Sequence, residues 1–177
     1  DLCNRYGLDT ISAGSTIAFA MECYEKGLIT KKETIGVELT WGNHEAIVKM
    51  VELMGRKEGF GAILADGVKE ASRRIGKGSE KFAMHVKGLE VPMHEPRRHK
   101  SMGLEYATSN RGACHLQGTP MFIERGMLMP EYGLKKKWTA SPLNASLKSL
   151  RFTKISAQLS MPLEYASSPY STSHRLI

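Results

Sequence analysis

One stretch of the sequence gathers reactive side chains. Residues 106–118 read YATSNRGACHLQG and place Arg111, Cys114 and His115 within five residues. Such a group could supply a nucleophile, ligate a metal, or belong to a loop that holds a charged group. A cysteine–histidine nucleophile pair is disfavoured, because neighbours in sequence seldom face each other on a helix or strand and no orienting acid is evident. We therefore expect Cys114 to be structural.

The other candidate ligands are scattered along the chain. No Cys-x-x-Cys pair is present among the three cysteines, so they predict neither a disulfide framework nor a local zinc or iron–sulfur site. Three further histidines lack cysteine or carboxylate partners at ligand-like intervals, which favours surface or hydrogen-bonded roles and disfavours zinc-dependent hydrolysis. The residues concerned are Cys3, Cys23, Cys114, His85, His94 and His99.

The elements that must position these residues are predicted to be helices. Residues 10–26, 43–57 and 60–75 carry apolar residues near helical spacing, and short glycine turns separate them. Asn43 is the expected N-cap of the second helix. The inward stripe of that helix is expected to contain Ile47, Val48, Val51 and Met54. The predicted fold class is mainly α.

The composition and periodicity of the sequence change after these helices. Residues 81–99 hold two prolines and three histidines, which predicts an extended or looping segment. Residues 103–107 could begin another helix. Residues 138–177 contain nine serines and one acid without a sustained period, which is typical of an irregular, disordered basic tail.

Charge and hydropathy exclude several classes of protein. The formal net charge is +7, but in residues 1–137 the 21 bases are interleaved with 17 acids, and there is no aromatic stacking surface or reader motif. No run of about 18 apolar residues and no secretory signal is present. We expect a cytoplasmic protein with no nucleic-acid partner and no membrane segment.

Three stretches together resemble the aldehyde:ferredoxin oxidoreductase family of tungsten, sometimes molybdenum, bis-pterin enzymes. Their order and spacing agree with that family, and the similarity runs from Leu2 to Leu134. The resemblance implies that residues 1–137 belong to the family's α-helical domains 2 and 3. The three stretches are NRYGLDTISAG at 4–14, AMHVKGLEVPMHEPR at 83–97 and YATSNRGACHLQG at 106–118.

The first stretch is similar to the family's pterin-binding signature, Asp-x-x-Gly-Leu-Asp, with Asn4 in place of the first acid. A carboxylate such as Asp9 can accept two coplanar donors of a pterin edge, while Gly7 lets the backbone approach. Leu8 would supply an apolar neighbour. Because Asn4 brings no charge, Asp9 is expected to contribute most of the polar contacts that recognise the pterin. A plain helix junction, with Gly7 as C-cap and Asp9 as N-cap, is an alternative and compatible interpretation.

The resemblance also implies a role for the reactive stretch. In the family a histidine lies close to the metal, and His115 matches it by motif and by distance from the Gly-Leu-Asp signature. An imidazole there could transfer the proton that aldehyde oxidation requires, so His115 is the predicted catalytic residue. Arg111, with Ser109 and Asn110, is expected either to anchor this loop near the anionic cofactor or to form a structural salt bridge.

The implied cofactors and partners are those of the family. A tungsten or molybdenum bis-pterin would accept two electrons as an aldehyde becomes a carboxylic acid, and a 4Fe-4S cluster would relay them to ferredoxin. The substrate stays open, because some relatives carry out reductive chemistry on aromatic thioesters. The resemblance leaves room for a homodimer. A small all-α interaction or regulatory module without catalysis is the alternative, and it would need none of the three stretches.

Family members carry further parts that this sequence does not contain, namely an N-terminal pterin-binding domain and the cysteines of the iron–sulfur cluster. The chain is therefore expected to be a fragment that cannot form a four-cysteine cluster and is inactive by itself. Codons from Trp138 onward can be chosen that also encode, in a frame displaced by two nucleotides, a stretch resembling the family's second pterin and cluster signature. We hypothesise a frameshift between Lys137 and Thr139, with a disordered tail as the alternative for residues 138–177.

Overall fold

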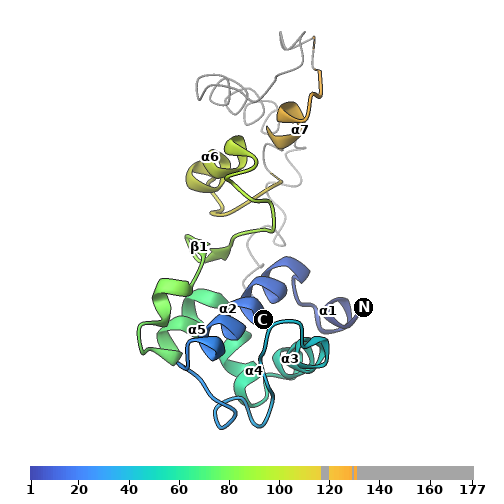
Figure 1. Cartoon of the computed structure of the whole chain (residues 1–177). Coiled ribbons are helices and arrows are strands. Elements are labelled where there is room, and N and C mark those ends of the chain that lie inside the picture. The colour runs from blue at the N-terminus through green and yellow to red at the C-terminus, as the bar shows by residue number, and fades with distance from the viewer. Residues whose placement is uncertain (117–119, 129, 131–177) are drawn as a thin grey trace. The chain divides into compact units, whose positions relative to one another are not determined.

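The computed structural model describes residues 1–116, 120–128 and 130, and this part of the chain is mainly helical, as predicted (Figure 1). It forms two compact units, Asp1–Val91 and the residues that begin at Pro92. The predicted boundary at residue 137 and the tail of residues 138–177 lie outside the described residues, so both remain predictions.

The N-terminal unit gathers its helices around one central helix (Figure 1). The central helix, α2, contacts every other helix of this unit and the second strand of a short hairpin. In chain order the elements are α1 (Leu2–Tyr6), α2 (Thr10–Glu25), α3 (His44–Arg56), α4 (Gly59–Leu64), α5 (Gly67–Ile75), the 3-10 helix η1 (Ser79–Phe82), β1 (His85–Val86) and β2 (Leu89–Glu90).

Helix α2 confirms the prediction for residues 10–26, but it is buried on more than one face. Small residues such as Ser12, Ala13 and Thr16 are buried together with Ile17 and Met21. Because small side chains let neighbouring elements approach closely, α2 can be surrounded rather than lie on the surface of the core. The bend that precedes α2 is thereby attached to a helix with several buried faces.

Helix α3 confirms the second prediction, with a corrected inward face. Asn43 is its N-cap, since Asn43 Oδ1 accepts a hydrogen bond from the Ala46 N–H at 3.2 Å. Val51 and Met54 are buried as expected, but Ile47 and Val48 are 39% and 48% exposed. The predicted stripe was wrong there, because the buried face follows the row of residues 46, 50 and 54, which repeats every four residues.

The third predicted helix, residues 60–75, is in fact two helices, α4 and α5. Gly67 has φ +83°, a left-handed conformation that interrupts a continuous helix and that glycine adopts at low cost. The first turn of α5 then receives its acceptor from elsewhere in the chain: Glu90 Oε1, at the end of β2, accepts the Val68 N–H at 2.7 Å. Glu90 is 1% exposed, so this contact ties the hairpin to α5 inside the unit.

Residues 81–99 are mostly extended or looping, as predicted, with the end of η1 at their start. Strands β1 and β2 form an antiparallel hairpin in which His85 pairs with Glu90. Both turn residues, Lys87 and Gly88, have positive φ, as the tightest hairpin turns require. The Gly88 N–H donates to His85 Nδ1 at 3.2 Å, so this histidine is hydrogen bonded, as expected.

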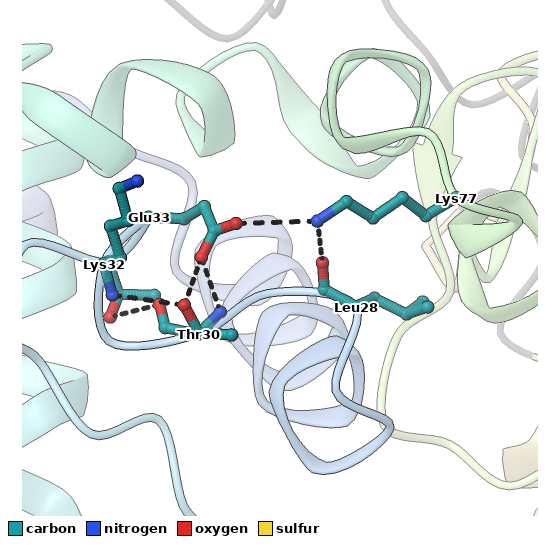
Figure 2. A network of polar contacts seen from close by, with 6 residues as sticks. Leu28, Thr30, Lys32, Glu33 and Lys77 are labelled. Carbon is teal, nitrogen blue, oxygen red and sulfur yellow. Dashed lines mark hydrogen bonds and ion pairs between the residues drawn. The ribbon is translucent and has the colours of Figure 1, made fainter.

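The loop between α2 and α3 is held by a polar network around Glu33 (Figure 2). Glu33 Oε2 accepts hydrogen bonds from the Thr30 backbone N–H at 2.9 Å and from the Thr30 hydroxyl. Lys77, just after α5, contacts Glu33 Oε1 at 3.5 Å and donates to the Leu28 carbonyl at 2.7 Å. The ammonium group of Lys77 therefore links this loop to the C-terminal end of α5.

The second unit contains α6 (Lys100–Thr108) and α7 (Pro120–Glu124), which contact each other. Helix α6 confirms the helix expected at residues 103–107 and begins earlier than predicted. Glu124 of α7 caps it, because Glu124 Oε1 accepts the Ser101 N–H at 2.8 Å. The Glu124 carboxylate also lies 3.5 Å from Nδ1 of His99, which is 7% exposed. These contacts fix the start of α6, from whose far end the reactive loop emerges.

Candidate functional site

The first candidate element is the bend between α1 and α2, residues 7–9. Gly7 ends α1 in the left-handed conformation, with φ +68°, and its N–H donates to the Asn4 carbonyl at 3.3 Å. The Leu8 N–H donates to the Cys3 carbonyl at 2.8 Å. Asp9 then caps α2, because its Oδ1 accepts the N–H groups of Ile11 at 3.1 Å and Ser12 at 2.7 Å. The helix junction that the sequence suggested as an alternative, with Gly7 as C-cap and Asp9 as N-cap, is therefore present.

The same bend leaves polar groups at the surface. Asn4, Gly7 and Asp9 are exposed. Asp9 Oδ1 already accepts two hydrogen bonds, whereas Oδ2 accepts none from the described residues. A carboxylate offers about four lone-pair sites, so the outer oxygen retains its capacity for two donors. Apart from Gly7 itself and its two chain neighbours, no described atom lies within 4 Å of where a Cβ on Gly7 would stand, so the space beside the bend is open.

The bend is held in place by close packing below it. Leu8 is 5% exposed and belongs to the hydrophobic core, so its side chain anchors the bend from inside. Tyr6 packs on Gly55 of α3, where an added Cβ would lie 2.2 Å from Tyr6 Cγ. The Tyr6 hydroxyl also accepts a hydrogen bond from Arg56 Nε at 3.3 Å. The sequence motif singled out the bend, but nothing in it pointed to Gly55.

The second candidate element is the loop after α6, residues 109–116. Ser109 ends the helix, and its N–H donates to the Glu105 carbonyl at 2.8 Å. The Gly112 N–H donates back to the Ser109 carbonyl at 3.2 Å, and the Cys114 N–H donates to the Gly112 carbonyl at 2.7 Å. Gly112 has φ +104°, so a glycine is required at this tight turn. Two consecutive turns thus carry the chain from α6 to His115.

Cys114 is the buried centre of this loop, in agreement with its expected structural role. It is 3% exposed, and its Sγ receives the Leu116 N–H at 3.4 Å and an Arg111 guanidinium N–H at 3.7 Å. Arg111 makes no ion pair within the described residues. Of the two roles expected for Arg111, the structural salt bridge is thus absent from the described part of the chain, and the arginine instead folds over the loop's own thiol.

His115 follows this buried cysteine and meets a histidine that the sequence did not connect with it. The centroids of the His94 and His115 rings are 5.1 Å apart, with an angle of 44° between the ring planes. Both side chains are partly exposed. The residues around 94 and 115 lie on either side of α6 in sequence, so only the fold brings them together. The proline-rich composition of residues 81–99 predicted a loop there but gave no signal of this contact.

The six residues predicted for the site fall into two sets. Asn4, Gly7, Leu8 and Asp9 belong to the N-terminal unit, and Arg111 and His115 belong to the second unit. The first set lies at the bend, where Asn4, Gly7 and Asp9 are exposed and Leu8 is buried, and the second set lies in the loop after α6. The described ranges contain no group of three or more metal-ligating side chains, and none of their helices is long and apolar enough to span a bilayer.

Comparison with known proteins matches both units to a single family. A family model described as "Aldehyde ferredoxin oxidoreductase, domains 2 & 3" matches residues 1–169. The tungsten-containing aldehyde ferredoxin oxidoreductase of Pyrococcus abyssi is 46% identical over 132 residues, which are 72% of this chain and 20% of that protein. The protein with the same description from Pyrococcus furiosus is 45% identical over 120 residues, 66% of this chain and 19% of its own length.

A solved structure agrees with this match. The active-site complex BamBC of benzoyl coenzyme A reductase, with bound 1,5-dienoyl-CoA, superposes with a TM-score of 0.54 at 26% identity, covering 75% of this chain and 22% of that chain. This chain thus spans only about a fifth of the length of the relatives it matches. From the extent of the family match and the identity to these relatives, the chain belongs to the aldehyde ferredoxin oxidoreductase family.

Proposed function

We propose that this chain is the part of a tungsten-pterin, or molybdenum-pterin, oxidoreductase that binds the pterin and transfers a proton during oxidation of an aldehyde to a carboxylic acid. The observation that carries the proposal is the exposed bend at Gly7 and Asp9, where a carboxylate oxygen without a hydrogen bond from the described chain lies beside open space. The family membership of the chain supports the same function.

The residues of the bend fit a flat, donor-rich ring system. Asp9 Oδ2 can accept the ring N–H and amino donors, while Oδ1 keeps its two capping bonds to α2. Gly7 presents bare backbone to the ring, and the exposed Asn4 can add one uncharged hydrogen bond. Leu8 acts from below, by fixing the bend to the core. When bound, the metal pterin would supply the two-electron chemistry.

His115 is the proposed proton-transfer residue, with Arg111 as an anchor of its loop. A partly exposed imidazole can take a proton from a reacting group and release it to solvent, and histidine does this near neutral pH more readily than any other side chain. The buried Cys114 beside it holds the backbone through its contacts with Leu116 and Arg111. The guanidinium of Arg111 remains exposed, so it can also approach an anionic cofactor.

The remaining parts of the reaction are proposed to lie in the rest of the longer protein. Electrons would pass through a 4Fe-4S cluster to ferredoxin, with cluster cysteines and an N-terminal pterin-binding domain supplied by residues that this chain does not contain. Relatives that are named as tungsten-containing aldehyde ferredoxin oxidoreductases support the metal, the aldehyde and the acceptor. A homodimer in the cytoplasm completes the proposal.

Replacing His115 with alanine in the complete, metal-loaded enzyme tests the catalytic assignment. We expect turnover to fall by about 10²-fold or more, because a positioned acid–base group typically contributes that factor. Metal and pterin content should stay at the level of the unmodified enzyme, since His115 is proposed to move protons and not to hold the cofactor. Turnover that is unchanged across pH would remove His115 from the mechanism.

A second candidate function is a small all-α interaction or regulatory module without catalysis. Ile47 and Val48, exposed on α3, are the observation that favours it, because apolar side chains at a surface can contact a partner. Metal analysis of the full-length gene product separates the two functions. Tungsten or molybdenum together with a pterin supports the oxidoreductase, and complete absence of all three supports the module.

A further inference from the structure

His94 and His115 are partly exposed, and their rings pack against each other. The two rings come from different loops, and the separation of 5.1 Å between their centroids is the distance of packed aromatic rings. Their planes are tilted by 44°, so neither ring covers the other completely. The contact therefore restricts how the His115 ring can turn while leaving part of it accessible.

The backbone of His94 is tied to α6 by a buried tyrosine. The Tyr106 hydroxyl donates a hydrogen bond to the His94 carbonyl at 3.0 Å, and Tyr106 is 4% exposed. Burial, with smaller contributions from Cys114 and Glu95, raises the pKa of Tyr106 to about 12. The phenol thus keeps its proton, and remains a donor, throughout the pH range in which an enzyme works.

The loop around His94 is also braced from its own side. The His94 N–H donates to the Pro92 carbonyl at 2.7 Å. Glu95, the next residue, is paired with Arg97 through Nε at 2.8 Å and through a terminal nitrogen at 2.9 Å. Pro96 lies against Gly103 of α6, where an added Cβ would be 3.1 Å from Pro96 Cβ. The loop that carries His94 is therefore packed on the helix from which the His115 loop emerges.

We propose that His94 is a positioning residue for His115, whose ring it holds by direct packing in the orientation needed for proton transfer. This inference rests on the proposed function of His115. His94 acts through the neighbouring ring and not on the substrate, so the aromatic surface of its side chain is the property that matters. A misplacement of a reacting group by about 1 Å can cost on the order of 10²-fold in rate, which is why a ring contact at this place has a catalytic effect.

Two substitutions of His94 in the complete, metal-loaded enzyme separate packing from acid–base chemistry. His94→Phe keeps an aromatic ring, and we expect kcat within about threefold of the unmodified enzyme. His94→Ala removes the ring, and we expect kcat to fall by about 10- to 100-fold with little change in KM, because the loss affects orientation and not binding. Equal losses in both variants, or no loss in His94→Ala, would overturn the proposal. His44→Ala, at the exposed start of α3 in the other unit, is the matched control.

A spectroscopic measurement on the 177-residue chain tests the contact without any catalysis. The chain has six histidines, so labelled histidine rings give a small set of nuclear magnetic resonance signals that single substitutions assign. We expect the His115 ring signal to move in His94→Ala and to move in Tyr106→Phe in the same direction by a smaller amount. If the His115 ring signal has the same chemical shift in both variants as in the unmodified chain, the proposed ring contact is wrong. Thermal melting of each variant shows that it is folded.

The two sets of results also distinguish failure of this inference from failure of the proposed function. If His115→Ala loses turnover while His94→Ala does not, His115 keeps its role and the positioning role of His94 is wrong. If the His115 signal responds to His94 while His115→Ala turns over normally, the contact is real but the proton-transfer function is wrong. Loss of turnover in both, with rescue by His94→Phe, supports both.

Discussion

At the scale of single residues, Asp9 uses one carboxylate oxygen for the cap of α2, and the other is the oxygen proposed to receive the pterin. Oδ1 caps α2 through the N–H groups of Ile11 and Ser12, and Oδ2 remains available at the surface. The capping and pterin-binding interpretations of the motif are therefore not rivals: the cap fixes the carboxylate in one orientation, and that orientation is what a ligand would meet. A substitution that preserves the cap but removes the charge can separate them.

Asp9→Asn and Asp9→Ala are expected to differ in stability but to agree in cofactor content. Asparagine is as good an N-cap as aspartate, whereas alanine loses about 0.5–2 kcal/mol of stability. If Oδ2 receives the pterin, both variants should purify with less metal and pterin, because neither presents a carboxylate. Denaturant unfolding and metal analysis measure the two effects. Asn43→Ala, which removes the corresponding cap of α3, is the matched control and should retain the cofactor. Full cofactor content in Asp9→Asn would leave Asp9 with the cap alone.

Glu33 shows how one exposed carboxylate can set the acid stability of a loop. The Thr30 hydroxyl and backbone N–H, and more weakly Lys77, lower the pKa of Glu33 from 4.5 to about 2 (Figure 2). A carboxylate whose pKa is lower in the folded than in the unfolded protein stabilises the fold above its unfolded pKa. That contribution is complete above about pH 4.5 and is lost progressively as the pH falls toward 2.

Glu33→Gln should therefore flatten the acid side of the stability profile. We expect the difference in unfolding free energy between the unmodified chain and the variant to be constant near pH 7 and to shrink between about pH 4.5 and 2. Urea unfolding at a series of pH values measures it. Glu80→Gln, at an exposed position of η1, is the control. If the difference in unfolding free energy does not change with pH, the pKa of Glu33 is the same in the folded and the unfolded chain, and the prediction is wrong.

At the scale of elements, the cap of α5 by Glu90 ties the hairpin to this helix. Glu90→Ala leaves the buried Val68 N–H without its acceptor, and we expect a loss of about 1–3 kcal/mol. Glu90→Gln keeps a carbonyl oxygen at that place and should lose less. Glu70→Ala, which removes a partly exposed carboxylate paired with Arg73 on the same helix, should change stability by about 0.5 kcal/mol or less. Denaturant unfolding measures all three. If Glu70→Ala and Glu90→Ala lose equal amounts of unfolding free energy, loss of the α5 cap does not explain the effect of Glu90→Ala.

The existence of helices could be predicted from sequence because periodicity and caps are local properties. Asn43 and Asp9 were identified as caps, since side chain and backbone partners lie within three residues. The split into α4 and α5 occurs at the left-handed Gly67, and the acceptor that caps α5 could not be predicted, because Glu90 is 22 residues from its partner Val68. The outward position of Ile47 was missed for the same reason, as the neighbours of α3 decide which of its apolar faces is buried.

The candidate site likewise has local features that the sequence could predict and a non-local contact that it could not. The Gly7–Asp9 bend and the loop that carries His115 could be located, because each is a contiguous motif with its own turn chemistry. The ring contact between His94 and His115 could not, because it spans α6 and arises when the two flanking loops pack on the same helix. His94 gave no spacing signal toward a cysteine or carboxylate, and an aromatic contact leaves no periodic pattern in a sequence.

At the scale of the whole molecule, the proposed site has to be considered within a longer protein. It spans about a fifth of its relatives, and its two units each carry one half of the proposed site. Whether the two halves face one cofactor is a property of the complete protein. A structure of that protein with bound cofactor would test this directly: Asp9 and His115 should line one cavity, and separate surfaces would end the proposed function.

The proposed frameshift between Lys137 and Thr139 makes the last prediction, and the coding DNA tests it. The family match continues to residue 169 in the printed frame, and residues 138–177 lie outside the described structure, so the nucleotide sequence has to decide. We expect the codons from Trp138 onward to encode, two nucleotides out of frame, the second pterin and cluster signature with its cysteine. Resequencing of the gene should then restore an open frame through that cysteine. Codons incompatible with the shifted reading would assign residues 138–177 to a native tail, without changing the assignments of Asp9 and His115.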